Sequence, residues 1–199
     1  MSADLPDADL VRDLQSDPGA LEALYRRHVR RLTLYTATRC RHPEDVADLV
    51  AATFVAALES AEIYDRARGD VLPWLIGIAR HLAADSARYA QREREALARV
   101  AGSRSLGSDE IAELEERIDA VRGTAELQIA LERLHLRDRE PLVLLGHVGL
   151  SSAEAAQALG ISPAAFRVRL MRARRALRKA LMQVSEADHD QVSVEGVTT

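Results

Sequence analysis

Apolar residues recur every three or four positions along most of the chain, which is the spacing of amphipathic α-helices. Runs of β-branched residues are few, whereas Ala, Leu, Arg and Glu are abundant, and this balance favours helix. The pattern predicts an all-α chain. Its first long stripe consists of Leu21, Leu24, Tyr25, Val29, Leu32 and Tyr35.

The next helix is expected from about Pro43 to Glu59, because proline suits a first helical turn and disfavours helix at the residue before it. Its core stripe is Val46, Leu49, Val50, Thr53, Phe54 and Ala57. The opposite face is thinly polar and holds Asp48, Ala51, Ala52, Val55 and Glu59. A helix that is apolar nearly all round is either deeply buried or covered by a partner. We favour a partner, with simple burial as the alternative.

A polar loop over residues 60–70 precedes a third helix, which we expect from about Pro73. Its expected inner face is Trp74, Leu75, Ile78, Leu82 and Tyr89, with Arg80, Ala84 and Arg88 turned outward. The composition then changes to a Gly- and Ser-containing stretch followed by an acidic amphipathic segment. We therefore expect two small helical domains joined by a flexible linker. The expected divisions are an acidic tail at 1–9, a first domain at 10–94, a linker at 95–124 with one marginal helix at 109–122, a second domain at 125–182, and a disordered acidic tail at 183–199.

The strongest local signal lies in the second domain, which we expect to hold four helices. Ser151 or Ser152 is placed to cap one helix, and Gly160 to end it in a left-handed conformation. Ser162 and Pro163 then suit the N-cap and first residue of the next helix. Helix, tight glycine turn and capped helix form the helix-turn-helix pattern.

The net charge of −4 argues weakly against nucleic-acid binding, but it hides a strong segregation of charge. Seven basic residues and no acidic one lie between Arg167 and Lys179, while Phe166, Leu170, Ala173 and Leu177 form the inner stripe of the same helix. The local charge matters more for nucleic-acid binding than the net charge does, because electrostatic interactions are screened over about 8–10 Å. A basic helix alone could be a solvated face or could bind an acidic protein. A basic helix that directly follows a glycine turn of this kind indicates DNA binding.

No residue pattern supports catalysis, a cofactor or a metal site. There is no phosphate-binding glycine loop, and the His residues at 28, 42, 81, 135, 147 and 189 lack metal-ligand spacing. His28 projects toward the apolar stripe, where we expect a satisfied boundary histidine. The single cysteine, Cys40, indicates a reducing cytoplasm. No apolar run reaches the roughly 18 residues of a membrane helix, so we expect no membrane insertion.

Taken in order, these segments resemble the extracytoplasmic-function type of sigma factor in the sigma-70 family. The segments that resemble its region two are Leu24-Tyr25-Arg26-Arg27-His28, Asp48-Leu49-Val50-Ala51-Ala52-Thr53-Phe54, Tyr64-Asp65-Arg66-Ala67-Arg68-Gly69 and Trp74-Leu75-Ile76-Gly77-Ile78-Ala79-Arg80. Those that resemble region four are Arg139-Glu140, Gly149-Leu150-Ser151, Leu159-Gly160-Ile161-Ser162-Pro163, Arg169-Leu170 and Arg172-Ala173-Arg174.

The resemblance implies which residues bind which partner. Those implied to dock on the clamp helices of the largest subunit of core RNA polymerase are Asp48, Leu49, Ala51, Ala52, Thr53 and Val55. Those implied to engage the −10 element of promoter DNA are Tyr64, Arg66, Arg68, Trp74, Arg80, His81 and Arg88. Those implied to read the −35 element are Ser162, Ala164, Ala165, Arg167, Val168, Arg169, Arg172 and Arg174. It also implies a contact of region four with the flap of the second-largest subunit, and an anti-sigma protein.

The chain departs from the family's pattern in three places. Ala51-Ala52 stands where Gln and an acidic residue are usual, which weakens polymerase docking or shifts it toward apolar contacts. His81 replaces the usual Asn near the −10 element. Ala165 and Val168 stand where hydroxyl residues are frequent, which suggests a −35 preference that uses thymine methyl groups.

Our interpretation is a sigma factor that directs promoter recognition and catalyses nothing. One rival is a stand-alone helix-turn-helix regulator, which leaves the thinly polar face of the second helix unexplained. The other is a sigma-derived helical interaction protein without initiation activity, for which Ala51-Ala52 is the best support.

We predict that Arg167→Ala weakens specific promoter binding, because one bidentate Arg–guanine contact contributes about 1–3 kcal/mol of discrimination. A titration against a specific promoter and an unrelated duplex measures the affinity and the sequence preference. Unchanged affinity together with unchanged sequence preference contradicts the role of Arg167.

Overall fold

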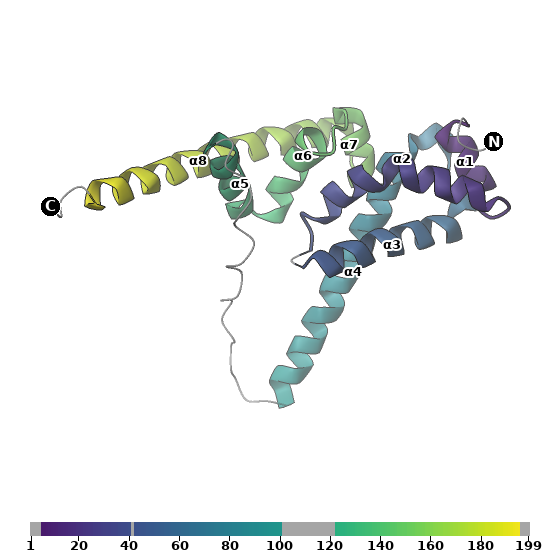
Figure 1. Ribbon diagram of the computed structural model, residues 1–199, viewed down its shortest axis with the longest axis horizontal. Helices are drawn as coiled ribbons and strands as arrows, with labels where there is room; N and C mark the ends of the chain where they lie inside the picture. The colour runs from purple at the N-terminus through teal and green to yellow at the C-terminus, as the bar shows by residue number, and fades with distance from the viewer. Residues whose placement is uncertain (1–4, 41, 101–121, 196–199) are drawn as a thin grey trace.

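The computed structural model describes residues 5–40, 42–100 and 122–195, and every regular element in those ranges is helical. The N-terminal domain consists of α1 (Asp7–Asp13), α2 (Pro18–Thr36), α3 (Pro43–Glu59), two short 3₁₀ turns, η2 (Ala61–Ile63) and η3 (Arg66–Arg68), and α4 (Val71–Val100). The C-terminal domain consists of α5 (Arg122–Arg133), α6 (Leu136–Gly146), α7 (Ser152–Leu159) and α8 (Pro163–Glu195). Two helical groups are visible, with α4 and α8 each running beyond its group (Figure 1). The prediction of an all-α chain with a helix-turn-helix domain is confirmed.

The N-terminus differs from the expected acidic tail, because residues 7–9 begin a helix that belongs to the first domain. Leu10 and Val11 of α1 are fully buried. The carboxylate of Asp7 lies 2.7 Å from Nε2 of His28 on α2 and also pairs with Arg27. Nε2 of His28 therefore has a partner, but the prediction of a satisfied boundary histidine holds only for that atom, because His28 is buried and its Nδ1 has no hydrogen-bond partner in the described structure. Burial lowers the pKa of His28, although Asp7 acts in the opposite direction. An apparently solvated acidic stretch therefore supplies the partner of a buried ring.

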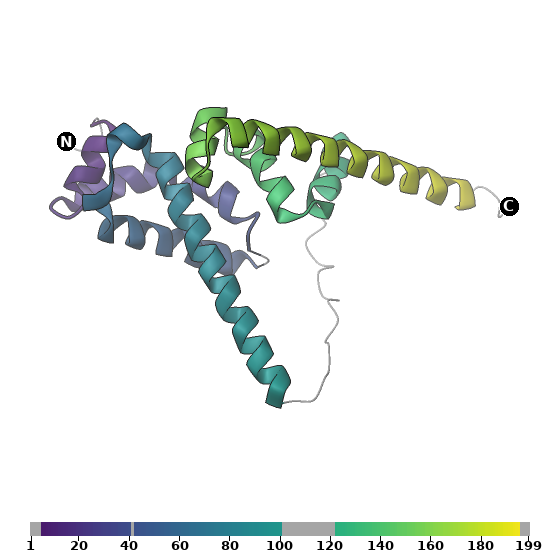
Figure 2. The ribbon, with the colours of Figure 1, turned by 180° about the vertical axis from the view of Figure 1, so that it is seen from behind.

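The core of the N-terminal domain lies among α2, α3 and α4. Leu24, Leu32 and Phe54 are buried there, and α3 has the predicted bounds. Two positions expected to face inward do not. Tyr25 is 45% exposed, although its ring packs at 5.0 Å on that of Phe54. Tyr89 is 70% exposed. It belongs to the second half of α4, a helix that runs on beyond the other helices of its domain (Figure 2).

The helix-turn-helix of α7 and α8 is built by the local chemistry that its sequence indicates. The hydroxyl of Ser151 accepts from the N–H of Glu154, whose carboxylate accepts in return from the N–H of Ser151. These two hydrogen bonds lower the pKa of Glu154. Gly160 ends α7 with φ 65° and ψ 33°, the left-handed conformation that favours glycine. Ser162 then caps α8 by accepting from the N–H of Ala165 at 3.2 Å.

The long helices cross the boundaries expected from composition. Helix α8 continues to Glu195, whereas a disordered tail was expected from residue 183. There is no glycine or proline between Pro163 and Gly196, and extending a nucleated helix is far easier than starting one. Helix α4 likewise occupies the first residues of the expected linker. The acidic linker helix expected at 109–122 lies outside the described residues, apart from Arg122 in α5.

The two domains pack on one another. One hydrophobic core runs from Leu10 and Leu24 in the N-terminal domain to Leu159 and Phe166 in the C-terminal domain. Helix α7 lies on α4 across this boundary. The two domains therefore share a packed contact.

We predict that Gly160→Ala destabilises the protein by about 1–2 kcal/mol, because an alanine strains the left-handed backbone there. No atom lies within 4 Å of the Cβ that the substitution adds, so the effect is purely conformational. Gly146→Ala is the matched control, since its Cβ also meets nothing but its backbone is helical. That control gains about 0.5–1 kcal/mol from helix propensity. Urea unfolding measures both, and equal effects contradict the role of Gly160.

Candidate nucleic-acid interface

The first turns of α8 present a free face to solvent. Phe166 and Leu170 are buried and fix the helix to its domain. Ala164, Ala165 and Arg167 are exposed, and Val168 is 47% exposed. A helix with one face packed on its domain and the opposite face exposed can enter a major groove of DNA.

The side chain of Arg169, which was predicted to read the −35 element, points back into the C-terminal domain. Its Nε donates to the carbonyl of Arg137 at 2.9 Å, and another nitrogen lies 2.8 Å from Oε2 of Glu140. Burial lowers the pKa of Arg169. The guanidinium therefore fastens α8 to α6.

The remaining cations of α8 stay in solvent. Arg172 and Arg174, both predicted site residues, are exposed, as is the hydroxyl-bearing Ser162 at the start of the helix. Arg175, Arg178 and Lys179 extend the exposed basic surface along the helix. These charges lie where phosphates on either side of a groove could be contacted.

The second predicted surface, on α3, is also open. Asp48, Ala51, Ala52 and Val55 are all exposed, and Val55 is 56% exposed. The alternative that this face is simply buried is therefore wrong for the chain by itself. An apolar hollow of about 570 Å³ adjoins it between α2 and α3, and Ala51 is among its lining residues.

Two of the residues predicted for this surface are not exposed to a partner. Thr53 is fully buried, and its hydroxyl donates to the carbonyl of Leu49 at 2.6 Å. Leu49 is itself half-buried. Both lie on the side of α3 that faces the domain core, so they support the surface from beneath.

The loop before α4 is folded around an aromatic pair. The rings of Tyr64 and Trp74 lie 4.9 Å apart at 49°, and the Tyr64 hydroxyl donates to the carbonyl of Gly69 at 2.9 Å. Burial raises the pKa of Tyr64. Gly69 has φ 134°, which closes the turn into α4. Arg66 is exposed at the rim, whereas the side chain of Arg68 lies outside the described part of the structure.

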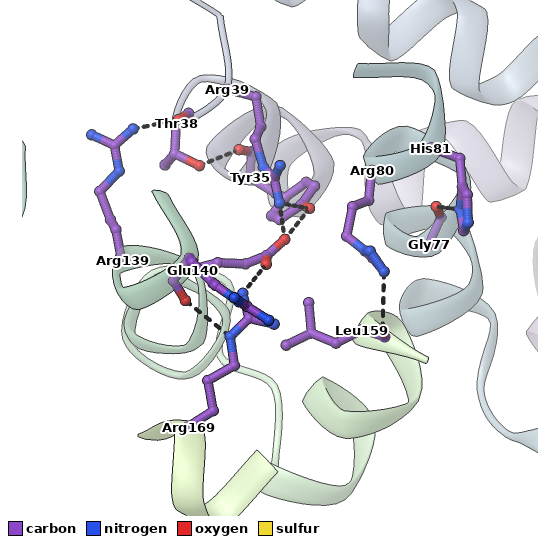
Figure 3. Close-up of polar contacts among 11 residues, drawn as sticks. Tyr35, Thr38, Arg39, Gly77, Arg80, His81, Arg139, Glu140, Leu159 and Arg169 are labelled. Atoms are coloured by element: carbon purple, nitrogen blue, oxygen red, sulfur yellow. Dashed lines mark hydrogen bonds and ion pairs between the residues drawn. The ribbon is translucent and has the colours of Figure 1, made fainter. Parts of the chain in front are cut away.

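The predicted site residues on α4 do not all face solvent. Arg88 is exposed and pairs with Asp85, and His81 is exposed with Nδ1 2.7 Å from the carbonyl of Gly77. Arg80 was expected to point outward, but it is half-buried and donates to the carbonyl of Leu159 in α7 at 3.0 Å (Figure 3). The C-terminal domain thus occupies part of the predicted −10 surface.

A buried polar cluster that the sequence analysis missed joins the two domains near this contact. Glu140 of α6 is 6% exposed and has three partners. The Tyr35 hydroxyl donates to its Oε1 at 3.0 Å, and the Arg39 and Arg169 guanidiniums pair with it (Figure 3). The sequence offered one weak signal, a tyrosine and an arginine four residues apart at the end of an apolar stripe.

Burial in this cluster shifts the pKa values of Tyr35 in α2 and of Arg39 just after it. It raises the pKa of Tyr35, although the neighbouring arginines act in the opposite direction, and it lowers the pKa of Arg39. The Arg39 guanidinium also lies over the Tyr35 ring, 5.1 Å from its centroid. The phenol therefore remains a hydrogen-bond donor to the carboxylate at neutral pH.

Among the described residues, no three His, Cys, Asp or Glu side chains gather as metal ligands would. None of the described helices combines the length and apolar character needed to cross a membrane.

These features define a two-domain helical protein with a helix-turn-helix in its second domain. The family model for sigma-70 region 2 matches residues 24–93, and that for sigma-70 region 4 matches residues 124–177. The RNA polymerase sigma factor NccH of Alcaligenes xylosoxydans xylosoxydans is 34% identical over 178 residues, which cover 88% of this chain and 93% of NccH. The ECF RNA polymerase sigma factor SigD of Mycobacterium tuberculosis is 34% identical over 72% of this chain and 65% of its own length.

A solved structure of CnrH in complex with the cytosolic domain of CnrY matches with a TM-score of 0.62 and 29% identity, over 89% of this chain and 97% of that one. CnrH is a sigma factor of Cupriavidus metallidurans. The chain belongs to the sigma-70 family of RNA polymerase sigma factors, in its extracytoplasmic-function branch. Its family function is transcription initiation, and the family is not a class of enzymes.

We predict that Arg169→Met lowers the free energy of unfolding by about 1–3 kcal/mol, because Glu140 and the carbonyl of Arg137 lose a buried donor. Arg167→Met, two residues away and exposed, changes it by less than about 0.5 kcal/mol. Urea unfolding of the two variants measures the difference. Equal stabilities show that Arg169 does not anchor α8.

Proposed function

We propose that this chain docks on core RNA polymerase through α3 and then directs it to promoters by reading two DNA elements, one with each domain. The observation that carries the proposal is the presence, in one chain, of an exposed apolar helix face and a separate exposed basic recognition helix. A stand-alone DNA-binding protein needs only the second of these surfaces.

The docking surface is the exposed side of α3. Asp48, Ala51, Ala52 and Val55 form it, and Leu49 and Thr53 support it from beneath. Contiguous apolar positions on the surface of a small domain are typical of a protein interface. The Ala51-Ala52 step makes this contact more apolar than the family's pattern, and the adjoining hollow beside Ala51 extends the same apolar area. We place the clamp helices of the largest polymerase subunit on it.

The −35 element is assigned to the front of α8. Arg167 supplies a bidentate donor, while Ala164, Ala165 and Val168 supply apolar contacts of the kind that meet thymine methyl groups. Arg172 and Arg174 contact phosphates, which makes binding dependent on salt. Arg169 contributes by holding the helix in place, as its bonds to Glu140 and Arg137 support.

The −10 element is assigned to the loop and the first half of α4. Reading a single strand requires a base to leave the stack, which takes a few kcal/mol and is offset by stacking on aromatic rings. The Tyr64–Trp74 pair provides an aromatic platform. The exposed Arg66, His81 and Arg88 on the loop and α4 are proposed as further cations or donors. Arg68 is kept from the sequence prediction, since its side chain lies outside the described part of the structure. Arg80 joins them once its bond to Leu159 is released.

The remaining partners follow from the family. We propose that the C-terminal domain also meets the flap of the second-largest subunit, and that an anti-sigma protein holds this chain, as CnrY and NepR are named with CnrH and RpoE in solved structures. The site of action is the cytoplasm, where polymerase and promoters meet. The chain itself catalyses nothing.

A reconstituted run-off assay tests the proposal against its rivals. A sigma factor yields transcripts from a cognate promoter only when this chain and core polymerase are both present. A stand-alone regulator binds duplex DNA without core and yields no transcript. A sigma-derived interaction protein binds core but starts no RNA.

We predict that Val55→Asp weakens association with core by about tenfold or more, since a charge placed in the centre of an apolar contact removes on the order of 2 kcal/mol. Ala153→Asp, at an exposed position on α7 of the other domain, is the control and leaves the affinity unchanged. Fluorescence anisotropy with labelled chain measures both. Equal affinities for the two variants exclude α3 as the docking surface.

A further inference from the structure

The start of α1 is held by two neighbouring side chains of α2. Nε2 of His28 lies 2.7 Å from Oδ2 of Asp7, and the Arg27 guanidinium pairs with the other oxygen of the same carboxylate. Arg27 also donates to the carbonyl of Leu5, just before α1, at 2.7 Å. Helix α1 has only seven residues, and so short a helix does not form by itself in water. Its place in the fold therefore depends on these bonds and on the burial of its apolar side.

The apolar side of α1 supports the loop that is proposed to read the −10 element. Helix α1 lies against η2 in this loop and against α4 (Figure 1, Figure 2). Leu10 and Val11 are fully buried, and they share one hydrophobic core with Ala61 of η2. Tyr64 and Trp74, the aromatic platform, pack against the same core. A displacement of α1 therefore removes part of the packing beneath the platform.

The charge of Asp7 also reaches Tyr64. Burial raises the pKa of Tyr64, and the carboxylates of Asp70 and Asp7 act in the same direction, while Arg66 opposes them. Asp7 is thus part of the electrostatic surroundings of both His28 and the platform. The two ends of this contact are a polar pair on α1 and α2 and an aromatic side chain in the loop.

The imidazole of His28 fits its place as a neutral ring. With Asp7 ionised, Nε2 carries the proton and donates it, so Nδ1 of the neutral ring carries only a lone pair. Nδ1 is buried and has no hydrogen-bond partner among the described residues. A second proton would place a donor there without an acceptor, which is unfavourable. Arg27 and Arg31 of α2 add positive charge near the ring, whereas Asp7 favours its protonation.

This environment makes the docking of α1 sensitive to acid. Burial lowers the pKa of His28, with Arg31 and Arg27 acting in the same direction and Asp7 opposing them. Once α1 detaches, His28 is open to solvent and its pKa returns toward about 6.5. Below that pH the detached form binds more protons than the docked form does. The docked form is therefore fully favoured above about pH 6.5 and loses stability as the pH falls further.

We propose that Asp7 and His28 are positioning residues for reading of the −10 element: their hydrogen bond holds α1 beneath the loop, and α1 holds Tyr64 where an unstacked base can pack on it. The inference rests on the proposed function. Neither side chain contacts DNA; both act through α1. A second proton on His28 releases α1, so capture of a single strand depends on pH through this pair.

A pair of variants on α1 tests the positioning role. Asp7→Ala removes the acceptor of His28 and Arg27, whereas Asp9→Ala removes only an acceptor of the exposed Arg12. We expect Asp7→Ala to lower run-off transcription with core polymerase by about fivefold or more, because a displaced loop no longer holds a base in place. Its affinity for core should equal that of the parent, since the docking surface on α3 is unaltered. Asp9→Ala should resemble the parent in both measurements.

Trp74 reports on the loop in the free chain, because it is the only tryptophan and its ring lies 4.9 Å from that of Tyr64. We expect acrylamide to quench Trp74 more strongly in Asp7→Ala than in Asp9→Ala. Circular dichroism first checks that both variants are folded.

A second pair of variants separates the hydrogen bond of His28 from its titration. His28→Gln keeps an N–H that can donate to Asp7 but takes up no proton. We expect quenching of Trp74 in the parent to rise between about pH 7.5 and about pH 5.5, and quenching in His28→Gln to stay level. His147→Gln, which changes an exposed histidine of the C-terminal domain, should follow the parent.

The positioning role is overturned if Asp7→Ala and Asp9→Ala behave alike, or if His28→Gln keeps the pH dependence of the parent. Equal losses of core affinity and of transcription in Asp7→Ala also overturn it, because a general loss of stability lowers both. The parent chain in the same run-off assay separates these results from failure of the proposed function. If the parent initiates with core, only the role of Asp7 and His28 is lost. If it yields no transcript, the function on which the inference rests is wrong.

Discussion

A carboxylate taken almost completely out of water sets the relation between the two domains. Burial of a charge is strongly unfavourable unless the charge is paired and hydrogen-bonded. Glu140 satisfies this requirement with Arg169 of its own domain and with Tyr35 and Arg39 of the other. Its internal partner comes from α8, and its two external partners come from α2 and the residues just after it. The same group therefore stabilises a domain and a domain contact.

The chemistry of the boundary explains how it can be specific. Arginines that donate to backbone carbonyls at helix ends require those ends to be correctly placed, so Arg31, Arg80 and Arg139 each fix one point of the contact. The hydrophobic core that continues across the boundary adds buried apolar area, but this interaction does not fix the orientation of the two domains. Each of these hydrogen bonds replaces one that the free groups would make to water, so its net contribution to stability is modest.

Of the three surfaces proposed to bind partners, the fold leaves two open to solvent and covers part of the third. The front of α8 and the outer side of α3 face solvent, while the strip of α4 beside Trp74 lies under α7. A sigma factor must hold its two DNA contacts at a separation that the promoter sets, and linked weak contacts act together only at that separation.

The sequence by itself determined the elements. Helical periodicity, Pro43, the cap formed by Ser151 and Glu154, and the left-handed Gly160 are local signals, because each depends on residues within a few positions of one another. They were sufficient to identify most of the helices, the helix-turn-helix and the family. Only the tertiary structure decided where the long polar side chains go. Arg169 and Arg80 were expected at DNA and instead bond Glu140 and Leu159, since a flexible side chain takes the partner that folding brings near it, and those partners lie 29 and 79 residues away in the chain.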